Sequence, residues 1–388
     1  MESNKNKPDL IGNPALPPVE NLNSFSPVGI SAGPVTVIPS LKQSFVEGSV
    51  QTPAGVIPRV SSLLTPEDRW GSFKCRLGAG RMHYAVDPGL YALGAPDEQS
   101  PVLVTANYKM SFDVLRQALP GRSAWILVLD TKGINVWCAA GKGTFGTYEL
   151  IHRLEVSGVK KVVKNRKIIV PQLGAPGVAA HTVKQFSGFK VYYGPAQAAD
   201  LPAYLDAGLK ATPEMRVMPF LIKDRAVLIP VELTEAVKPF IIISFVALLL
   251  AAILGPADAL NNLLHGGLFA VLMLAVAIIA GAVLSPILLP WIPGRAFSVK
   301  GLMIGLIAAA GLIYWRGIDW TLWAGRMEAA AWLLMVPAIS AYLAMNFTGC
   351  STYTSLSGVK KEMRFALPAQ ISAAALGVVL WITSLILS

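Results

Sequence analysis

Five stretches without charged residues occupy the last 150 residues of this 388-residue chain and restrict its fold more than any other feature. A helix that crosses the hydrocarbon core of a bilayer needs roughly 20 apolar residues. Four stretches reach that length directly, and the third (301–315) reaches it only if Lys300 snorkels and residues 296–299 join it. We predict five transmembrane helices, with four as the alternative, at about 239–257, 266–292, 297–315, 329–348 and 366–387.

The charges are distributed unevenly along the chain. Residues 239–388 contain seven Lys/Arg and four Asp/Glu, which leaves 26 of the 33 basic and 19 of the 23 acidic residues for 1–238. The net charge of +10 therefore divides into +7 and +3, with no basic block that would indicate nucleic-acid binding. The chain is expected to have a polar N-terminal domain and a membrane domain (236–388).

The basic residues of the connecting segments predict the orientation in the membrane. The second and fourth segments contain two and three Lys/Arg, whereas the third contains two and the first none. The positive-inside rule then places the N-terminal domain in the cytoplasm and the C-terminus outside, at the cell (inner) membrane. The start, MESNKNKPDL, lacks the apolar run of a secretory signal peptide, which agrees with this orientation. Five tryptophans near the predicted helix ends are expected to form an aromatic belt: Trp291, Trp315, Trp320, Trp323 and Trp332.

The N-terminal part begins with a predicted flexible leader (1–60), rich in Pro, Asn, Ser and Gly. Residues 61–235 then alternate between short apolar runs and helical patterns. This alternation predicts a Rossmann-like α/β domain with a mostly parallel sheet. Ligands of such sheets bind beyond the carboxyl ends of the strands, which points to the loops after Tyr108, Asp130, Val170 and Tyr193.

Three cysteines, Cys75, Cys138 and Cys350, stand far apart, and the four histidines show no ligand spacing. Zinc sites and iron–sulfur clusters need three or four clustered ligands, so we expect neither from this chain alone. Cysteine chemistry here would use one thiol at a time.

The segment INVWCAAGKGTFGT (134–147) is the most informative in the sequence. It follows the predicted buried strand 124–130 and begins a helical turn of small residues around Cys138. Small residues let a flat ligand approach the backbone, and free NH groups at a helix start favour the thiolate, the form that ligates metals. The alternative is that Cys138 is a small buried apolar side chain, as most free cysteines are.

Four segments carry a resemblance to a known family: NVWCAAGK (135–142), PGLYALG (88–94), SPVLVTANYK (100–109) and YYGPAQAADLPAYL (192–205). They resemble the corrinoid proteins of microbial mercury methylation (HgcA type). The domain is also similar to the corrinoid-binding domain of the corrinoid iron–sulfur protein large subunit. That relative lacks the cysteine and carries its own iron–sulfur module.

This resemblance implies a cobalamin-type corrinoid, bound base-off, with the Cys138 thiolate as the lower axial cobalt ligand and no iron–sulfur cluster in this chain. Thr105 is implied as a contact to the corrin edge. Loop 171–177 and the turn from Gly194 to Ala198 are weaker candidates. The cap helix under the corrin would comprise Asn135, Val136, Trp137, Cys138, Ala139, Ala140, Gly141 and Lys142.

The implied function is a membrane-bound corrinoid methyltransferase that methylates Hg(II). The implied partners are a ferredoxin-like reductant with two [4Fe–4S] clusters (HgcB type) and a methyltetrahydrofolate-dependent methyl donor. One alternative is a corrinoid methyl carrier of one-carbon metabolism in the acetyl-CoA pathway. Another is a polytopic transporter with a cytoplasmic regulatory domain. His152, His181, Cys75 and Cys350 are expected to be structural, with a mercury relay at Cys350 as the minor alternative.

Overall fold

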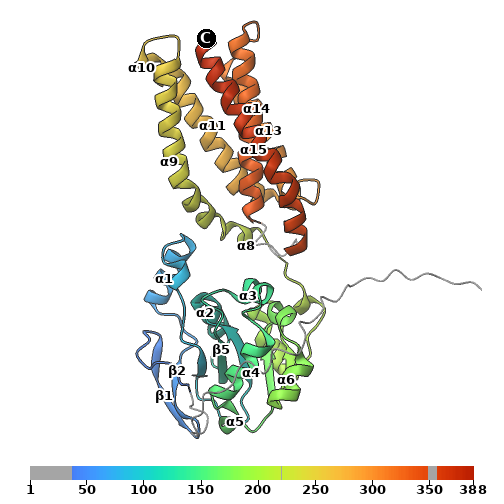
Figure 1. Cartoon of the computed structure of the whole chain (residues 1–388). Helices are drawn as coiled ribbons and strands as arrows, with labels where there is room; N and C mark the ends of the chain where they lie inside the picture. Colours follow the sequence, from blue (N-terminus) through green and yellow to red (C-terminus); the bar gives the residue numbers. More distant parts are fainter. Residues whose placement is uncertain (1–36, 220, 348–355) are drawn as a thin grey trace, which may run out of the picture. The chain divides into compact units, whose positions relative to one another are not determined.

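A computed structural model describes residues 37–219, 221–347 and 356–388 and contains a seven-stranded mixed sheet (Figure 1). The strand order is β1-β2-β3-β5-β4-β6-β7, and β4 pairs in parallel with β5 and β6. Two pairs are antiparallel, β1 with β2 and β3 with β5. The predicted α/β class with a mostly parallel sheet is confirmed. The strands are β1 (Val46–Thr52), β2 (Gly55–Val60), β3 (Gly89–Leu93), β4 (Val102–Ala106), β5 (Ala124–Leu129), β6 (Lys167–Val170) and β7 (Lys190–Tyr193).

The first two strands lie inside the segment for which a flexible leader was predicted. Strand β1 pairs with β2, and β2 continues the sheet through parallel pairing with β3. Ile57 and Val60 of β2 are buried. The prediction of a leader up to residue 60 is therefore wrong for 46–60, because these apolar side chains are covered by tertiary contacts. Residues 1–36 lie outside the described part of the chain.

The central strands are apolar along their whole length because helices cover both faces of the sheet. Alternate residues of β5 point to opposite sides, so that Trp125 and Leu127 join one core cluster and Ile126 and Val128 join the other. Residues of α4, α5 and α6 belong to the first cluster, whereas residues of α2 and α7 belong to the second. The helical segments are α1 (Pro66–Arg76), η2 (Arg81–His83), α2 (Lys109–Gln117), α3 (Val136–Lys142), α4 (Thr147–Val156), α5 (Val159–Val162), η3 (Gln172–Gly177), α6 (Ala180–Ser187), η4 (Ala198–Asp200), α7 (Leu201–Asp206) and η5 (Glu214–Arg216).

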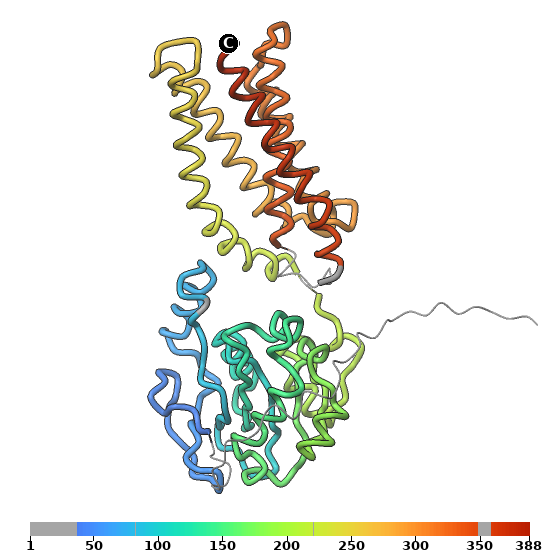
Figure 2. Tube along the Cα trace, in the orientation of Figure 1, coloured from blue at the N-terminus to red at the C-terminus, as the bar shows by residue number. Residues whose placement is uncertain are grey.

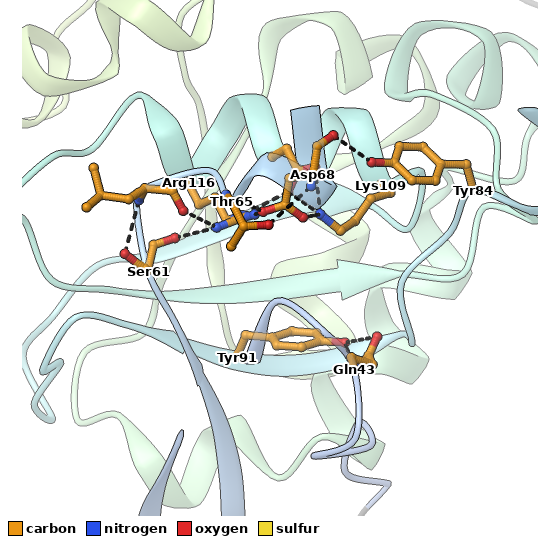
Figure 3. A network of polar contacts seen from close by, with 10 residues as sticks. Gln43, Ser61, Thr65, Asp68, Tyr84, Tyr91, Lys109 and Arg116 are labelled. Atoms are coloured by element: carbon orange, nitrogen blue, oxygen red, sulfur yellow. Dashed lines mark hydrogen bonds and ion pairs between the residues drawn. The ribbon is translucent and has the colours of Figure 1, made fainter. Parts of the chain in front are cut away.

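A buried set of four charged side chains joins α1 to α2 (Figure 3). The Lys109 Nζ lies 2.6 Å from carboxylate oxygens of both Asp68 and Asp113. The Arg116 guanidinium lies 2.6 Å from Asp68 and 2.8 Å from Asp113. Two cations thus face two anions, and this buried charge quartet is neutral as a unit, as buried charges must be to avoid a large desolvation cost.

Hydrogen bonds hold Asp68 of the quartet in its ionised form. Burial by itself would raise the pKa of this carboxyl, but hydrogen bonds from Lys109, the Thr65 amide and Arg116 outweigh burial and lower the pKa to about 2. Thr65 also caps α1 by accepting a hydrogen bond from the Asp68 amide at 3.2 Å. The quartet therefore determines how α1 packs against α2.

Among the described residues, five helices of the C-terminal part are long and apolar enough to cross a membrane, which confirms the predicted number. Figure 2 shows the course of these helices. They extend over Ile222–Leu254, Ala259–Leu288, Phe297–Arg316, Trp323–Asn346 and Gly358–Leu387. The first begins well before residue 239, and Lys300 is buried, with its Nζ donating to the Leu289 and Ile292 carbonyls. The segments are α8 (Ile222–Ala226), α9 (Ile229–Leu254), α10 (Ala259–Asn262), η6 (Leu263–Gly267), α11 (Leu268–Ile278), η7 (Ile279–Leu284), α12 (Ser285–Leu288), α13 (Phe297–Arg316), α14 (Trp323–Asn346) and α15 (Leu356–Leu387).

The tryptophans do not all occupy the predicted aromatic belt. Trp291, Trp315, Trp320 and Trp323 are exposed, as such a belt requires. Trp332 is only 2% exposed and packs against the rings of Phe269 and Trp381 inside the helix bundle. The prediction is wrong for Trp332 because α14 begins at residue 323, which places this ring more than two turns inside the helix.

Small residues bring α13 and α14 into close contact. A Cβ atom added at Gly305 would lie 2.8 Å from the Pro337 Cα atom and from the Ser340 Cβ atom. Close approach of this kind lets helices gain van der Waals contact where lipid removes the hydrophobic driving force.

We expect Gly305→Val to destabilise the helix bundle by about 1–3 kcal/mol, because a larger side chain must push α13 away from α14. The measurement is thermal unfolding of the detergent-solubilised chain. Gly311→Val is the matched control, since no atom lies within 4 Å of a Cβ added there on the same helix. Equal melting temperatures of the two variants would contradict the prediction.

Candidate functional site

The predicted cap segment forms α3, a helix of seven residues that carries Cys138 in its first turn. Asn135 is the N-cap residue, and its Oδ1 accepts a hydrogen bond from the Cys138 amide at 2.9 Å. Gly143 ends the helix with a left-handed φ of 83°, a conformation that glycine adopts without strain. The backbone amide of Cys138 therefore has a hydrogen-bond partner in the cap. The side chain of Cys138 is half-buried.

Asn107, which directly follows β4, holds the loop that leads into α3. Its Oδ1 accepts hydrogen bonds from the Thr131 amide (3.1 Å), the Thr131 hydroxyl (2.8 Å) and the Gly133 amide (3.0 Å). The Thr131 hydroxyl also lies 2.6 Å from the Ile134 carbonyl oxygen. Because Asn107 is 94% buried, this acceptor has no competition from solvent, and it sets the position at which α3 begins.

The two sides of α3 differ in composition and exposure. Ala139 and Ala140 are buried in the core cluster between α3 and the sheet. Cys138, Gly141 and Lys142 lie three or four residues apart and share the opposite side, where Gly141 and Lys142 are exposed. Apart from the backbone of α3 itself, no atom of the described residues lies within 4 Å of a Cβ added at Gly141, so there is open space beside this glycine.

A cavity of about 260 Å³ lies at the carboxyl ends of β4, β6 and β7, next to the start of α3. None of the described residues around it carries a charged side chain, and its wall is mostly apolar. Gly194 gives it room, because a Cβ there would lie 3.1 Å from the Ile169 Cγ2 atom. The lining residues are Leu103, Val104, Thr105, Ser111, Val114, Leu115, Asn135, Val136, Trp137, Ile169, Pro171, Leu173, Gly194, Pro195, Ala196, Ala198 and Leu201.

The structure brings six of the predicted site residues together in this cavity and leaves five outside it. Those that line it come from β4, the start of α3 and the turn after β7: Thr105, Asn135, Val136, Trp137, Gly194 and Ala198. Those that do not line it are Cys138, Ala139, Ala140, Gly141 and Lys142. The cavity and the exposed side of α3 are thus two neighbouring surfaces of one short helix.

Several residues at the site were not predicted. Helix α2, which follows the loop after Tyr108, contributes Ser111, Val114 and Leu115 to the cavity wall. Arg216 is more distant in sequence. Its Nη1 donates hydrogen bonds to the Tyr193 and Gly194 carbonyls, both at 3.0 Å, and it also contacts Gln172 Oε1. Arg216 therefore connects the loop after β6 with the turn after β7, and a lone arginine offered no sequence signal for this role.

The other residues considered from the sequence lie apart from the cavity. His152 and His181 are exposed on α4 and α6 and do not line it. Cys75 is buried, and its Sγ lies 3.1 Å from the Tyr108 hydroxyl oxygen. Burial raises the pKa of the Tyr108 phenol above its usual value. Cys350 lies outside the described residues.

We expect Asn107→Ala to loosen the entry into α3, because the Thr131 and Gly133 amides lose their acceptor, each at a cost of about 1–3 kcal/mol, whereas the Thr131 hydroxyl keeps the Ile134 carbonyl. Hydrogen exchange of the full chain should show faster exchange at Thr131 and Gly133 and in α3. The matched control is Asn165→Ala, which removes an amide that donates to the Gln99 and Ser100 carbonyls before β4 begins. If Asn165→Ala accelerated exchange in α3 as strongly, Asn107 would have no specific role there.

The α/β domain matches known proteins over this same region. Residues 79–205 match the protein family described as CO dehydrogenase/acetyl-CoA synthase delta subunit. The match includes β3 to β7, α3 and the whole cavity wall, and it ends before α8.

Three curated relatives illustrate how far the similarity extends. The acetyl-CoA decarbonylase/synthase complex subunit gamma of Methanothermobacter thermautotrophicus is 32% identical over 128 residues, which cover 32% of this chain and 28% of the relative. The subunit gamma 2 of Methanosarcina thermophila is 33% identical over 130 residues (32% and 27%). The corrinoid/iron–sulfur protein large subunit of Moorella thermoacetica is 28% identical over 126 residues (32% and 28%). The chain thus spans little more than a quarter of the length of these relatives.

Proposed function

We propose that the α/β domain binds a corrinoid and that the chain is a membrane-bound corrinoid methyl-transfer protein. The observation that carries the proposal is that the matched region, residues 79–205, contains both α3 and the cavity beside it. One relative, which matches 126 residues of this chain, is named as a corrinoid/iron–sulfur protein. The corrinoid would supply a methyl group bound to cobalt.

The residues present fit such a group. The cavity is uncharged and mostly apolar, and small residues (Gly194, Ala196 and Ala198) let a ligand approach the backbone closely. At about 260 Å³ it has room for one edge or a side chain of a large flat ligand, while the open space beside Gly141 leaves room for the rest. Thr105, at the end of β4, offers a hydroxyl to that edge.

In this proposal the Cys138 thiolate would ligate the cobalt of a corrinoid bound in its base-off form, and the cap holds the backbone of Cys138. Asn135 fixes the Cys138 amide, and Asn107 fixes the loop before it, so the thiol is presented from a defined turn. Ala139 and Ala140 anchor the opposite side of α3 in the core. The exposed side, with Gly141 and Lys142, would lie under the corrin together with Val136 and Trp137.

For the acceptor we propose Hg(II), with methylmercury as the product. A thiolate donates electron density to a metal that it ligates, which favours release of a methyl group with its electron pair. Such a carbanion equivalent (or a radical) suits an electrophile such as Hg(II). Donation of a methyl cation to a nucleophile gains nothing from this ligand, so Cys138 is the residue that favours mercury.

The second candidate function is a methyl carrier of one-carbon metabolism, and the names of the relatives favour it over mercury methylation. Two of the three name subunits of acetyl-CoA decarbonylase/synthase complexes, and the third names a corrinoid/iron–sulfur protein. The two candidates share the corrinoid and differ in the acceptor. The two candidate functions can therefore be distinguished by offering Hg(II) and an acetyl-CoA synthase to the same corrinoid-loaded protein.

Protein partners and location complete the proposal. Since the relatives are named as subunits of complexes, this chain is also proposed to work with protein partners. These would be a ferredoxin-like reductant with two [4Fe–4S] clusters (HgcB type) and a methyltetrahydrofolate-dependent methyl donor. The five apolar helices would hold the chain in the cell membrane with the α/β domain in the cytoplasm and the C-terminus outside.

The test is to reconstitute the purified full chain with methylcobalamin, which brings the methyl group to be transferred, under anaerobic conditions and to record its visible spectrum. A corrin spectrum followed by conversion of Hg(II) to methylmercury is the expected result. A corrin spectrum with methyl transfer only to an acetyl-CoA synthase would favour the carrier. A protein that stays colourless would overturn the corrinoid proposal and leave a transporter with a regulatory domain.

A further inference from the structure

A second cavity, distinct from the one beside α3, lies between α13, α14 and α15 in the C-terminal part. It has a volume of about 1060 Å³, at the upper end of the range for clefts that enclose small ligands. Its wall is formed by aliphatic and aromatic side chains, among them Val299 and Leu302 of α13, Leu334 of α14, and Phe365 of α15. Helices of this apolarity lie in a bilayer, so lipid is the solvent that reaches this groove.

Two cationic side chains lie at one end of this groove. Arg295, directly before α13, and Lys361, in the first turns of α15, both line it and are exposed. Within the described residues neither forms an ion pair. Among the described residues, Glu362 is the one acidic residue that lines the groove; its Oε1 accepts a hydrogen bond from the Ser298 amide at 2.6 Å, and it forms no ion pair with either cation. Two cations and one carboxylate therefore line this end of the groove, which leaves a net charge of +1.

Deeper in the groove lies Gln370 of α15, whose side-chain amide has no partner among the described residues. Gln370 is 9% exposed, and neither its Nε2 nor its Oε1 forms a hydrogen bond there. It lines this groove and also a neighbouring cavity of about 580 Å³. A buried amide without hydrogen-bond partners costs free energy in an apolar medium. A ligand with a polar group at this depth would remove that cost by forming a hydrogen bond with the Gln370 side chain.

We propose that this groove binds an anionic phospholipid. Its phosphate would lie against Arg295 and Lys361, its acyl chains along the apolar wall, and a glycerol ester carbonyl would accept a hydrogen bond from the Gln370 Nε2. Charge complementarity favours an anionic headgroup, because the two cations outnumber the one lining carboxylate and neither forms an ion pair in the described part of the chain.

The positions of the polar groups along α15 agree with one lipid molecule. Gln370 follows Lys361 by nine residues, which corresponds to about 13.5 Å of helix rise. Side chains of a helix lean toward its N-terminus, so the amide extends back toward the level of Lys361. The acyl-linked carbonyls of a phospholipid lie just below its phosphate, between these two levels.

The charge arm of the test compares phosphatidylglycerol with phosphatidylcholine of the same acyl chains, added to the delipidated full chain and counted by native mass spectrometry. The parent should prefer phosphatidylglycerol. Arg295→Gln and Lys361→Gln should each lower that preference about fivefold, and the double variant should abolish it. The double variant Lys360→Gln/Arg364→Gln is the matched control, since it removes two exposed charges of the same segment that do not line the groove. Equal binding of both lipids by the parent, or an equal loss in the control, would overturn the proposal.

The carbonyl arm compares diacyl with diether phosphatidylglycerol, which lacks the ester carbonyls. The parent should bind the diacyl lipid more tightly, and Gln370→Leu should remove this difference while it keeps the preference for phosphatidylglycerol over phosphatidylcholine. A Gln370→Leu protein that still distinguishes ester from ether would show that Gln370 does not contact the lipid. Neither arm depends on a corrinoid.

Discussion

Replacement of Cys138 by alanine is expected to lower methylmercury formation by the reconstituted full chain about 100-fold, the upper range for loss of groups that tune a metal site. The cavity residues from β4, α2 and β7 are unchanged, so the corrinoid should still bind. Its visible spectrum should differ from that of the parent, because a thiolate ligand of cobalt is absent. The measurements are the anaerobic visible spectrum and the rate of methylmercury formation from the same preparation.

Cys75→Ala is the matched control for this experiment. Cys75 is the other described cysteine of the α/β domain, and it is buried beside the Tyr108 hydroxyl, away from the cavity lining. The Cys75→Ala protein should retain the parental spectrum and rate. A Cys138→Ala protein that retained both would refute the ligand role, and with it the argument for Hg(II) as acceptor. The corrinoid itself would remain supported by the matched region.

The second large effect is expected at the buried charge quartet. Arg116→Met keeps an unbranched, flexible side chain but removes the guanidinium, which leaves Asp68 and Asp113 to share Lys109 as their one remaining cation in the quartet. Removing one partner from a buried ion pair costs about 3–5 kcal/mol, because an uncompensated charge stays in the core. Arg116 also donates to the Ser61 and Leu63 carbonyls, which would lose their donor. The free energy of opening of α2 amides, from native-state hydrogen exchange of the detergent-solubilised chain, measures this cost.

An exposed arginine of the same domain provides the comparison. Arg122 forms a bidentate pair with Asp206 at 2.7 and 2.6 Å, but both side chains are largely in water. Arg122→Met should therefore cost less than about 1 kcal/mol. Similar losses for the two variants would show that burial of the quartet contributes little. Because α2 also lines the cavity, Arg116→Met is expected to weaken corrinoid binding as well.

The division into an α/β domain and a membrane domain could be predicted because it depends on local properties of the chain. The length of an uncharged run decides whether a helix spans a bilayer, and the five runs correspond to five helices. The run 124–130 is apolar at every position, which is typical of a strand covered on both faces, and β5 is such a strand. Each of these signals is complete within about 20 consecutive residues.

The arrangement of the site was decided by tertiary structure. Thr105, Asn135, Gly194 and Ala198 were predicted as separate candidates, but only the strand order brings β4, α3 and β7 around one cavity. The role of Asn107 depends on a loop more than 20 residues further along the chain.

Dependence on tertiary contacts also explains the predictions that were wrong. Strands β1 and β2 are rich in residues typical of a leader, and their burial depends on pairing with β3, about 30 residues away. Trp332 lies in the bundle because of where α14 begins and what packs around it. Composition and periodicity report what a segment can bury by itself. What it is buried against, and which distant side chain satisfies its polar groups, depends on contacts that only the folded chain makes.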